Sequence, residues 1–476
     1  MKIIAVDPQE ERRIVRKLDY CLIPLMTIFY LLSFLDRANI GNARVAGLQK
    51  DLGLTDRQYQ ICITVLYVPY IIAELPSNLL LRRLGPNLVM PSILTIWGMV
   101  CALQGVVTTF QGLATVRAFL GLVEGPMFPG IVLYLSSFYT RKELSLRIAL
   151  FFSAASLSGA FSGLLAAAIV NMHGVGGKAG WAWIFILEGS FTVLVGLLGF
   201  FFVPSTPNDL KFMTQEEREF IIQRLHADRP TTTIEEKFTF REVWRSLLSP
   251  QVLLNFVSLF MAGTTLYGLA LFLPSIVNQL GYSATHTQLV SVGPFAAGFF
   301  VTIITSYVSD RYSCRALVAV ASSLLSMVGF IVFLKSTSTK MAYGSLFLSV
   351  SGIYPLPPIL SAWMANNSEP HYRRATSVAF GFVATNAGGI LSTWSFPTSE
   401  SPRYTKTTIM DISFCIIIIV FSTLNVLYLN YATHQKERNR DEILAPYITS
   451  DKAVEDGGEA AWIDLGDRHP DFRYAF

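Results

Sequence analysis

The chain has 476 residues, of which 52% are hydrophobic and 15% are charged, and its mean hydropathy is +0.46. Soluble domains carry about 25% charged residues, so this composition excludes an ordinary soluble domain and a disordered chain and predicts a membrane protein with several spans. The formal net charge of +4 and the five scattered cysteines predict neither a nucleic-acid partner nor a disulfide framework.

Apolar stretches recur along the whole chain, and a membrane-spanning helix needs about 20 mostly apolar residues. The first half has candidates at 20–38, 58–81, 88–107, 112–137, 146–170 and 181–203. The second half has candidates at 251–275, 288–309, 316–334, 341–362, 374–396 and 407–431. We therefore predict an all-α membrane protein with twelve transmembrane helices in two six-helix pseudo-repeats.

The polar segments between these stretches suggest the domain boundaries. We expect an N-terminus at 1–19, an N-terminal six-helix bundle at 20–203, a linker with amphipathic helices at 204–250, a C-terminal bundle at 251–431 and a tail at 432–476. The N-terminal segment lacks the basic start and apolar core of a cleavable signal peptide. With the N-terminus inside, inner segments hold about three times as many lysines and arginines as outer ones, which predicts that both termini are cytoplasmic.

The first predicted span ends in FLDRANIGNA, which carries Asp36 and Arg37. Ionisable residues at membrane depth cost at least a few kcal/mol each and are candidates for function. Arg37 could hold a carboxylate substrate in a bidentate pair. Asp36 points about 100° away around the helix and could pair with another element. The alternative is that both residues only cap the span at the outer interface.

A basic turn follows the second span of each half. The first, NLLLRRLGP, holds Arg82 and Arg83, and the second, SYVSDRYSCR, holds Asp310 and Arg311. The corresponding positions of the two turns indicate a repeat relation between the halves. We interpret Glu74, in the span before the first turn, as a structural brace or gate.

The fourth predicted span, in ATVRAFLGLVEGPMFPG, carries Arg117 and Glu124 two helical turns apart. That spacing places both on one side of the helix, about 10 Å apart. Glu124 could bind and release a proton, tuned by Arg117; the alternative is a structural ion pair between neighbouring helices. Gly121 and Gly125 indicate close packing against another helix, and the prolines after them indicate a kink.

Glu188 lies in the sixth span, and its role stays open between function and structure. The spans of the second half, between their ends, show only polar candidates. These are Tyr267, Asn386 and Trp394, which we expect to supply polar and aromatic substrate contacts. Helix packing is the alternative for all three.

The linker predicts two amphipathic helices lying under the bundle. Thr214 and Glu217 form a capping-box pattern ahead of EEREFIIQRLHA. In FTFREVWRSLLSP, apolar residues recur at helical spacing at Phe240, Val243, Trp244 and Leu247. A structural brace is the preferred reading, with a regulatory segment as the alternative.

Chemistry of other kinds is not indicated. There is no phosphate-binding GxxxxGK[ST] run, no HExxH or other metal cluster and no catalytic constellation. We therefore expect neither an enzyme nor a protein that carries a cofactor or metal.

Several motifs resemble the major facilitator superfamily. They are FLDRANIGNARVAGLQKDLGL, ELPSNLLLRRLGP, RAFLGLVEGPMFPGIVLYLSSFYTRKELSLRIALFF, WAWIFILEGS and NAGGILSTW. Within the superfamily the chain resembles the anion:cation symporter family and its fungal allantoate permease branch, and above all the high-affinity nicotinate transporters. The resemblance extends from about residue 15 to the end.

This resemblance implies a twelve-helix transporter that works by alternating access and imports an organic anion with protons. It implies that Arg37 contacts the anion and that Arg117 and Glu124 are the fourth-span pair. Arg117, Gly121 and Gly125 also meet the superfamily pattern R-x-x-x-G-x-x-x-G.

The resemblance also implies four gating residues, in the turns that correspond to the superfamily pattern G-x-x-x-D-R-x-G-R-R: Arg82, Arg83, Asp310 and Arg311.

Both turns depart from that pattern. The first has Asn78 for the leading glycine and Arg82 for the aspartate, and the second has Ser306 and Ser313 for glycines. The span around Tyr267 also lacks the extra arginine of some relatives, which favours a monocarboxylate over a doubly charged anion.

Together these observations predict a proton-coupled importer of a small organic anion, such as nicotinate or allantoate, at a fungal plasma membrane. We expect a monomer whose partners are the anion, protons and the lipid bilayer. Two alternatives remain open: an exporter of a secondary metabolite by proton antiport, and a nutrient receptor that binds without transport.

Overall fold

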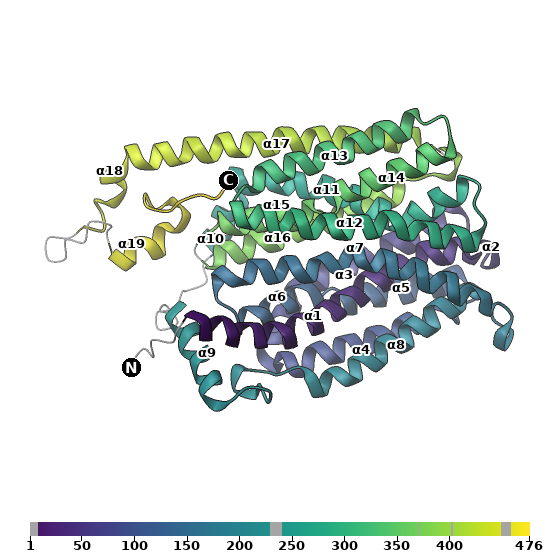
Figure 1. Cartoon of the computed structure of the whole chain (residues 1–476), viewed down its shortest axis with the longest axis horizontal. Helices are drawn as coiled ribbons and strands as arrows, with labels where there is room; N and C mark the ends of the chain where they lie inside the picture. Colours follow the sequence, from purple (N-terminus) through teal and green to yellow (C-terminus); the bar gives the residue numbers. More distant parts are fainter. Residues whose placement is uncertain (1–7, 229–239, 370, 401–402, 449–457) are drawn as a thin grey trace. The chain divides into compact units, whose positions relative to one another are not determined.

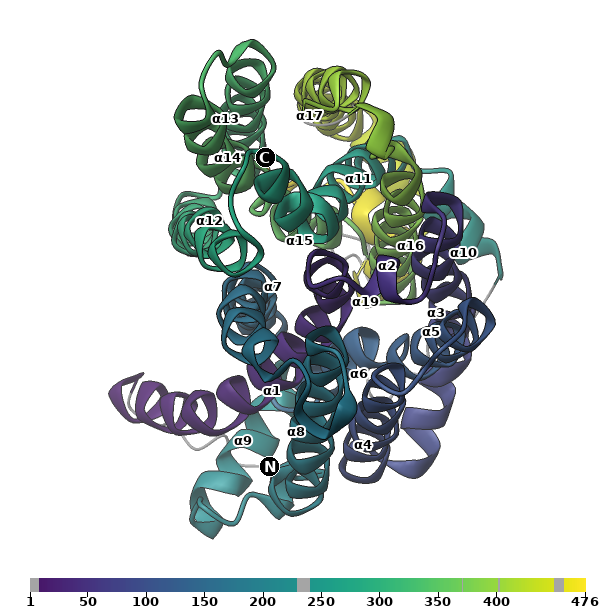
Figure 2. The same ribbon diagram turned by 90° about the vertical axis from the view of Figure 1, so that its right-hand side faces the viewer.

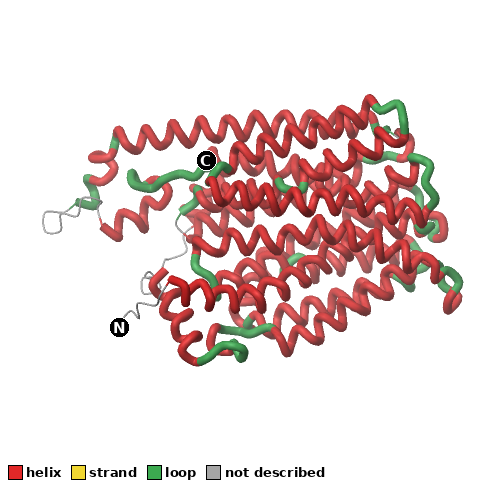
Figure 3. Tube along the Cα trace, viewed as in Figure 1, coloured by secondary structure: helices red, strands yellow, loops and turns green. Residues whose placement is uncertain are grey.

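The computed structural model describes residues 8–228, 240–369, 371–400, 403–448 and 458–476, and within these the side chains of a few helical positions, including 74–83, are not described. Every regular element assigned in the described part of the chain is a helix (Figures 1 and 3). This agrees with the predicted all-α fold class.

The first half of the chain forms nine α-helices, several of them long enough to cross a bilayer. They are α1 (Pro8–Val45), α2 (Leu48–Asp51), α3 (Asp56–Leu84), α4 (Pro86–Gln104), α5 (Phe110–Glu124), α6 (Met127–Ser136), α7 (Arg141–Ile169), α8 (Gly180–Phe202) and α9 (Gln215–Asp228). The predicted kink in the fourth span is a break, because α5 ends at Glu124 and α6 begins at Met127, after Gly125 and Pro126.

The second half adds ten α-helices among the described residues. They are α10 (Phe240–Leu247), α11 (Pro250–Gln279), α12 (Ala284–Tyr312), α13 (Arg315–Lys335), α14 (Thr339–Ile353), α15 (Leu356–Asn366), α16 (His371–Ser395), α17 (Thr405–Arg438), α18 (Arg440–Leu444) and α19 (Gly458–Leu465). Each of the twelve predicted spans coincides with one of these helices or with a consecutive pair. Nine helices of the described chain are long and apolar enough to cross a membrane.

The chain divides into two compact units that do not follow the two halves of the sequence. Unit 1 contains residues 1–236 together with 267–303 and 389–404, and unit 2 contains 237–266, 304–388 and 405–476. The ends of α11 and α16 and most of α12 therefore pack with the helices of the first half.

Small residues set the closest helix contacts inside each unit. In unit 1, α4 packs along α8, and a Cβ added to Gly98 would lie 2.6 Å from the backbone nitrogen of Val193 (Figure 2). In unit 2, α13 packs along α14, and a Cβ on Gly352 would lie 2.3 Å from the nitrogen of Ser326. Only glycine permits backbones to approach this closely.

The linker helices form where the sequence predicted them. Thr214 and Glu217 complete a reciprocal capping box, with hydrogen bonds of 3.0 and 3.3 Å. On α10, 61% of the surface of Trp244 is exposed. The side chain of Phe240 lies outside the described residues.

Candidate functional site

The candidate site is centred on Arg37 of α1, deep inside unit 1. Arg37 is 4% exposed and Asp36 beside it is fully buried, so these residues are not an interfacial cap. The Arg37 Nη2 atom lies 2.5 Å from Glu124 Oε1 at the end of α5. Ser33, one turn earlier on α1, donates to the same carboxylate oxygen at 2.6 Å. A buried ion pair that is also hydrogen-bonded is the arrangement that keeps two charges at such depth.

Aromatic rings surround the Arg37 guanidinium. Its Nη1 donates to the Tyr267 hydroxyl at 2.7 Å, and its Cζ lies 4.8 Å from the ring centre of Tyr70, 5.2 Å from that of Phe34 and 6.0 Å from that of Tyr67. Phe34 and Tyr267 stack with their centroids 6.1 Å apart. We call Phe34, Tyr67, Tyr70 and Tyr267 the aromatic cage. A cation over such ring faces is electrostatically favourable.

Some hydrogen-bonding capacity at this site is unused. Within the described structure, Glu124 Oε2, Arg37 Nε and the Tyr67 hydroxyl are buried and have no hydrogen-bond partner. Native proteins leave few buried polar atoms unpaired, and those that remain call for an explanation such as a ligand or a proton.

Between Arg37 and the end of α1, close contacts join α1 to α11 and α12. A Cβ added to Gly41 would lie 2.3 Å from the carbonyl oxygen of Leu271 on α11, so these two helices touch there. Gln288 on α12 donates to the carbonyl of Asn42 at 3.2 Å. The site is therefore closed off on the side where α1 ends.

The two charged residues of the fourth predicted span have different surroundings. The ion pair of Glu124 is with Arg37 of α1, which corresponds to the alternative of an ion pair between neighbouring helices. Arg117 is also buried, and within the described structure its Nε and Nη1 atoms have no hydrogen-bond partner; its electrostatic neighbours include Tyr59 and Cys62. A role of Arg117 in tuning proton binding by Glu124 stays a prediction.

A second polar cluster connects α1 with α8. Asp36 accepts a hydrogen bond from Thr192 at 3.3 Å, which agrees with the expectation that it pairs with another element. Asn39 donates to Glu188 Oε2, and neither carboxylate forms an ion pair with a described residue. These contacts connect Glu188 to the same helix that carries Arg37.

The other predicted substrate contacts are dispersed. Tyr267 meets Arg37 as described above. Trp394 is 43% exposed and its indole Nε1 donates to Thr64 Oγ1 at 3.1 Å. Asn386 belongs to unit 2, is buried and donates to the carbonyl of Phe382 at 3.1 Å. Substrate contact by Asn386 and Trp394 stays a prediction.

The structure describes the side chains of only some of the predicted gating residues. The side chains of Glu74, Arg82 and Arg83 lie outside the described residues. Asp310 forms an ion pair with Arg315 at 2.8 Å, and Arg311 is exposed. Their role in gating stays a prediction.

Sequence reasoning missed two features. The expectation that the second half has no ionisable side chain within its spans is wrong: Asp411, in the first turns of α17, is 3% exposed and accepts a hydrogen bond from Thr265 at 2.8 Å. The aromatic cage was also missed except for Tyr267. Its signal was present, because Tyr67 and Tyr70 are three residues apart on one face of α3.

Comparison with known proteins identifies the fold and the family. The model of the Major Facilitator Superfamily matches residues 26–393. An uncharacterized transporter of Schizosaccharomyces pombe is 32% identical over 99% of this chain and 91% of its own. The high-affinity nicotinic acid transporter of Saccharomyces cerevisiae is 31% identical over 98% of this chain and 85% of its own.

Solved structures show the same fold. The proton:xylose symporter XylE superposes with a TM-score of 0.65 at 16% identity, covering 86% of this chain and 94% of its own. A bacterial homologue of the lysosomal transporter Spinster also gives 0.65, at 15% identity, covering 85% and 96%. At these identities the structures show the fold alone. The chain is therefore a multi-pass membrane protein, and it belongs to the major facilitator superfamily of transporters.

Proposed function

We propose that this protein is a proton-coupled importer of a small aromatic carboxylate of the nicotinate class, within the fungal allantoate permease branch of the anion:cation symporters. It would act as a monomer in the plasma membrane with both termini cytoplasmic. The observation that carries the proposal is the buried Arg37–Glu124 pair inside the aromatic cage. The 31% identity to a nicotinic acid transporter supports the choice of substrate class.

The coupling follows from competition for one guanidinium. Arg37 is held by the Glu124 carboxylate, so a substrate carboxylate meets an occupied cation and the negative charge of Glu124. Protonation of Glu124 removes that charge and frees Arg37 for a bidentate pair with the substrate. By linkage, a proton that strengthens anion binding is itself bound more tightly when the anion is present. The two ligands would thus move together.

The aromatic cage suits a flat substrate ring. Aromatic pairs prefer offset-stacked or edge-to-face contacts with centroids about 4.5–7 Å apart. Phe34 and Tyr267 already stack at 6.1 Å, and Tyr67 and Tyr267 meet edge to face at 5.3 Å. A pyridine or benzene ring could replace one of these contacts while its carboxylate reaches Arg37. An aliphatic anion would forgo the ring contacts.

The closed side of unit 1 fits one state of an alternating-access cycle. In the proposed orientation, the contacts of Gly41 with Leu271 and of Asn42 with Gln288 lie on the outer side of Arg37. Release of these contacts would open the site to the outside. A substrate anion and a proton bound together leave a neutral centre, which is cheaper to enclose than a net charge.

The proposal is tested by uptake of labelled nicotinate at pH 5 and pH 7.5, in cells that lack their own nicotinate uptake. Wild type should accumulate more substrate at pH 5. Glu124→Gln has a similar shape but cannot ionise, so it should lose accumulation while keeping a pH-independent exchange of labelled for unlabelled substrate. Glu216→Gln, at an exposed position on α9, is the matched control.

The outcomes separate the two parts of the proposal. Uptake that is equal at both pH values and unchanged in Glu124→Gln would refute the proton coupling. Absence of uptake at either pH, with the protein verified at the cell surface, would remove nicotinate as the substrate. A panel of aromatic and aliphatic carboxylates would then separate the two substrate types.

A further inference from the structure

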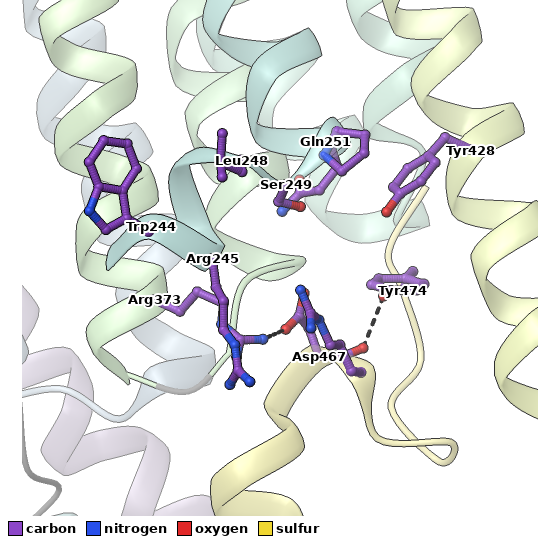
Figure 4. Close-up of a pocket in the computed structure, with 11 residues that line it drawn as sticks. Trp244, Arg245, Leu248, Ser249, Gln251, Arg373, Tyr428, Asp467 and Tyr474 are labelled. Carbon is purple, nitrogen blue, oxygen red and sulfur yellow. Dashed lines mark hydrogen bonds and ion pairs between the residues drawn. The ribbon is translucent and has the colours of Figure 1, made fainter. Parts of the chain in front are cut away.

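A cavity of about 450 Å³ lies in unit 2, far from Arg37 in sequence and not used by the transport proposal. Its walls come from α10, the start of α11, the start of α16, α17 and the C-terminal tail (Figure 4). A volume of this size is within the range of small-molecule sites, which is about 300–1,000 Å³.

The lining is strongly basic. The residues that line the cavity include three arginines, Arg245, Arg373 and Arg468, and one carboxylate, that of Asp467. Arg373 is 3% exposed and is fixed by an ion pair with Asp467, and Lys436 binds the backbone carbonyl of Asp467 at 3.0 Å. Burial raises the pKa of the Asp467 carboxyl, which the Arg373 guanidinium partly opposes. The side chains that line the cavity therefore carry more positive than negative charge, which suits an anion.

Polar groups in the same wall can hydrogen-bond a ligand. Gln251 donates its Nε2 to Ser368 at 3.0 Å, but its buried Oε1 has no partner within the described structure. The Tyr474 hydroxyl donates to the Asp467 carbonyl at 2.9 Å, which ties the tail to the cavity. A ligand that carries hydroxyl or amine donors beside its anionic group would satisfy the Gln251 oxygen.

The outer rim of the cavity is apolar. Trp244 and Leu248, one helical turn apart on α10 and its end, are 61% and 66% exposed and both line the cavity. An exposed tryptophan beside basic residues is typical of the membrane–water interface. The cavity also sits where α11, a membrane span, begins at Pro250.

We propose that this cavity binds the phosphate head group of an anionic phospholipid, with Trp244 and Leu248 contacting its acyl chains. The arginines meet the phosphate, Gln251 accepts from a hydroxyl of the phosphate, and the apolar rim favours a lipid over free phosphate. Basic pockets at the ends of membrane helices bind anionic lipid head groups by the same chemistry. The inference depends on membrane insertion and is independent of the transported substrate.

The test uses the purified full-length protein in a nonionic detergent. Binding is measured by native mass spectrometry and by thermal shift, with dioctanoyl phosphatidic acid, dioctanoyl phosphatidylcholine and inorganic phosphate as separate probes. We expect binding of phosphatidic acid that weakens at least about tenfold in the double variant Arg245→Gln/Arg468→Gln, because two positive charges that attract the phosphate are lost. Trp244→Ala should weaken binding of phosphatidic acid and leave that of inorganic phosphate unchanged.

The matched control is Arg438→Gln, which removes one exposed positive charge at the end of α17 and does not line the cavity. Arg438→Gln should leave phosphatidic acid binding unchanged. Equal weakening in Arg438→Gln and in the double variant would overturn the site, because the effect would then be general electrostatics. Inorganic phosphate binding as tightly as the lipid, with no effect of Trp244→Ala, would overturn the lipid assignment in favour of a free phosphoanion.

Discussion

The contact between α3 and α5 gives the sharpest prediction, because it joins helix packing to the site. A Cβ added to Gly121 would lie 2.0 Å from the carbonyl oxygen of Leu66, whereas Cβ contacts below 3.0 Å essentially never occur. Gly121→Ala must therefore separate the two backbones by about 1 Å, a form of overpacking that costs about 1–3 kcal/mol. Alanine regains about 1 kcal/mol of helix propensity. We expect a net loss of up to about 2 kcal/mol.

The separation of α3 and α5 in Gly121→Ala would also move residues of the candidate site. Tyr67 and Tyr70 follow Leu66 on α3, and Glu124 follows Gly121 on α5. Tyr70 lies 4.8 Å from the Arg37 guanidinium, so a shift of about 1 Å weakens the cation–π contact and misaligns the ion pair. Gly121→Ala should therefore reduce transport as well as stability.

The assay is thermal unfolding followed by a thiol-reactive dye, because Cys62, Cys101 and Cys415 are buried and react only on unfolding. Gly344→Ala is the control: no atom lies within 4 Å of the Cβ position at that exposed helical site, so it should stabilise. Unfolding of Gly121→Ala at or above the wild-type temperature would refute the α3–α5 contact described here.

Three further changes test other parts of the structure. Ser313 has a φ of 51°, where a non-glycine residue costs about 1–2 kcal/mol, so Ser313→Gly should raise the unfolding temperature and Ser313→Ala should not. Thr265→Val leaves the Asp411 carboxylate without its 2.8 Å hydrogen bond and should lower the free energy of unfolding, measured with a chemical denaturant, by about 1–3 kcal/mol. Thr265→Ser keeps a hydroxyl and should lower it less. Equal losses in the two variants would contradict this account. Burial alone would raise the pKa of Glu217, but hydrogen bonds from Lys17 and Thr214 outweigh it and hold the pKa below its usual value. Because the pKa of this carboxyl is lowered in the folded state, its ionised form stabilises the docked α9 at neutral pH, and this stabilisation is lost as the pH falls through the lowered pKa. Hydrogen-exchange protection of α9, corrected for intrinsic exchange rates, should therefore fall in acid in the wild type. It should not fall in Glu217→Gln.

The sequence by itself determined the features that depend on short-range chemistry. The apolar runs located the helices, and the capping box of Thr214 and Glu217 located the start of α9. Pro126 and Pro129 indicated the kink that the structure shows as a break between α5 and α6. Each follows from residues within a few positions of one another, where backbone hydrogen bonding and hydropathy decide the outcome.

Only the tertiary structure decided which charged and aromatic side chains meet. Helical spacing placed Glu124 on the same side of its helix as Arg117 but could not show which residue of another helix it meets, and the structure pairs it with Arg37 of α1. The aromatic cage draws Tyr267 from α11 to rings on α1 and α3, and Asp411 meets Thr265 of α11. The sequence spacing of residues within a helix determines on which face of that helix each residue lies. The rotation and depth of neighbouring helices, set by contacts such as Gly121 on Leu66, decide what that face touches.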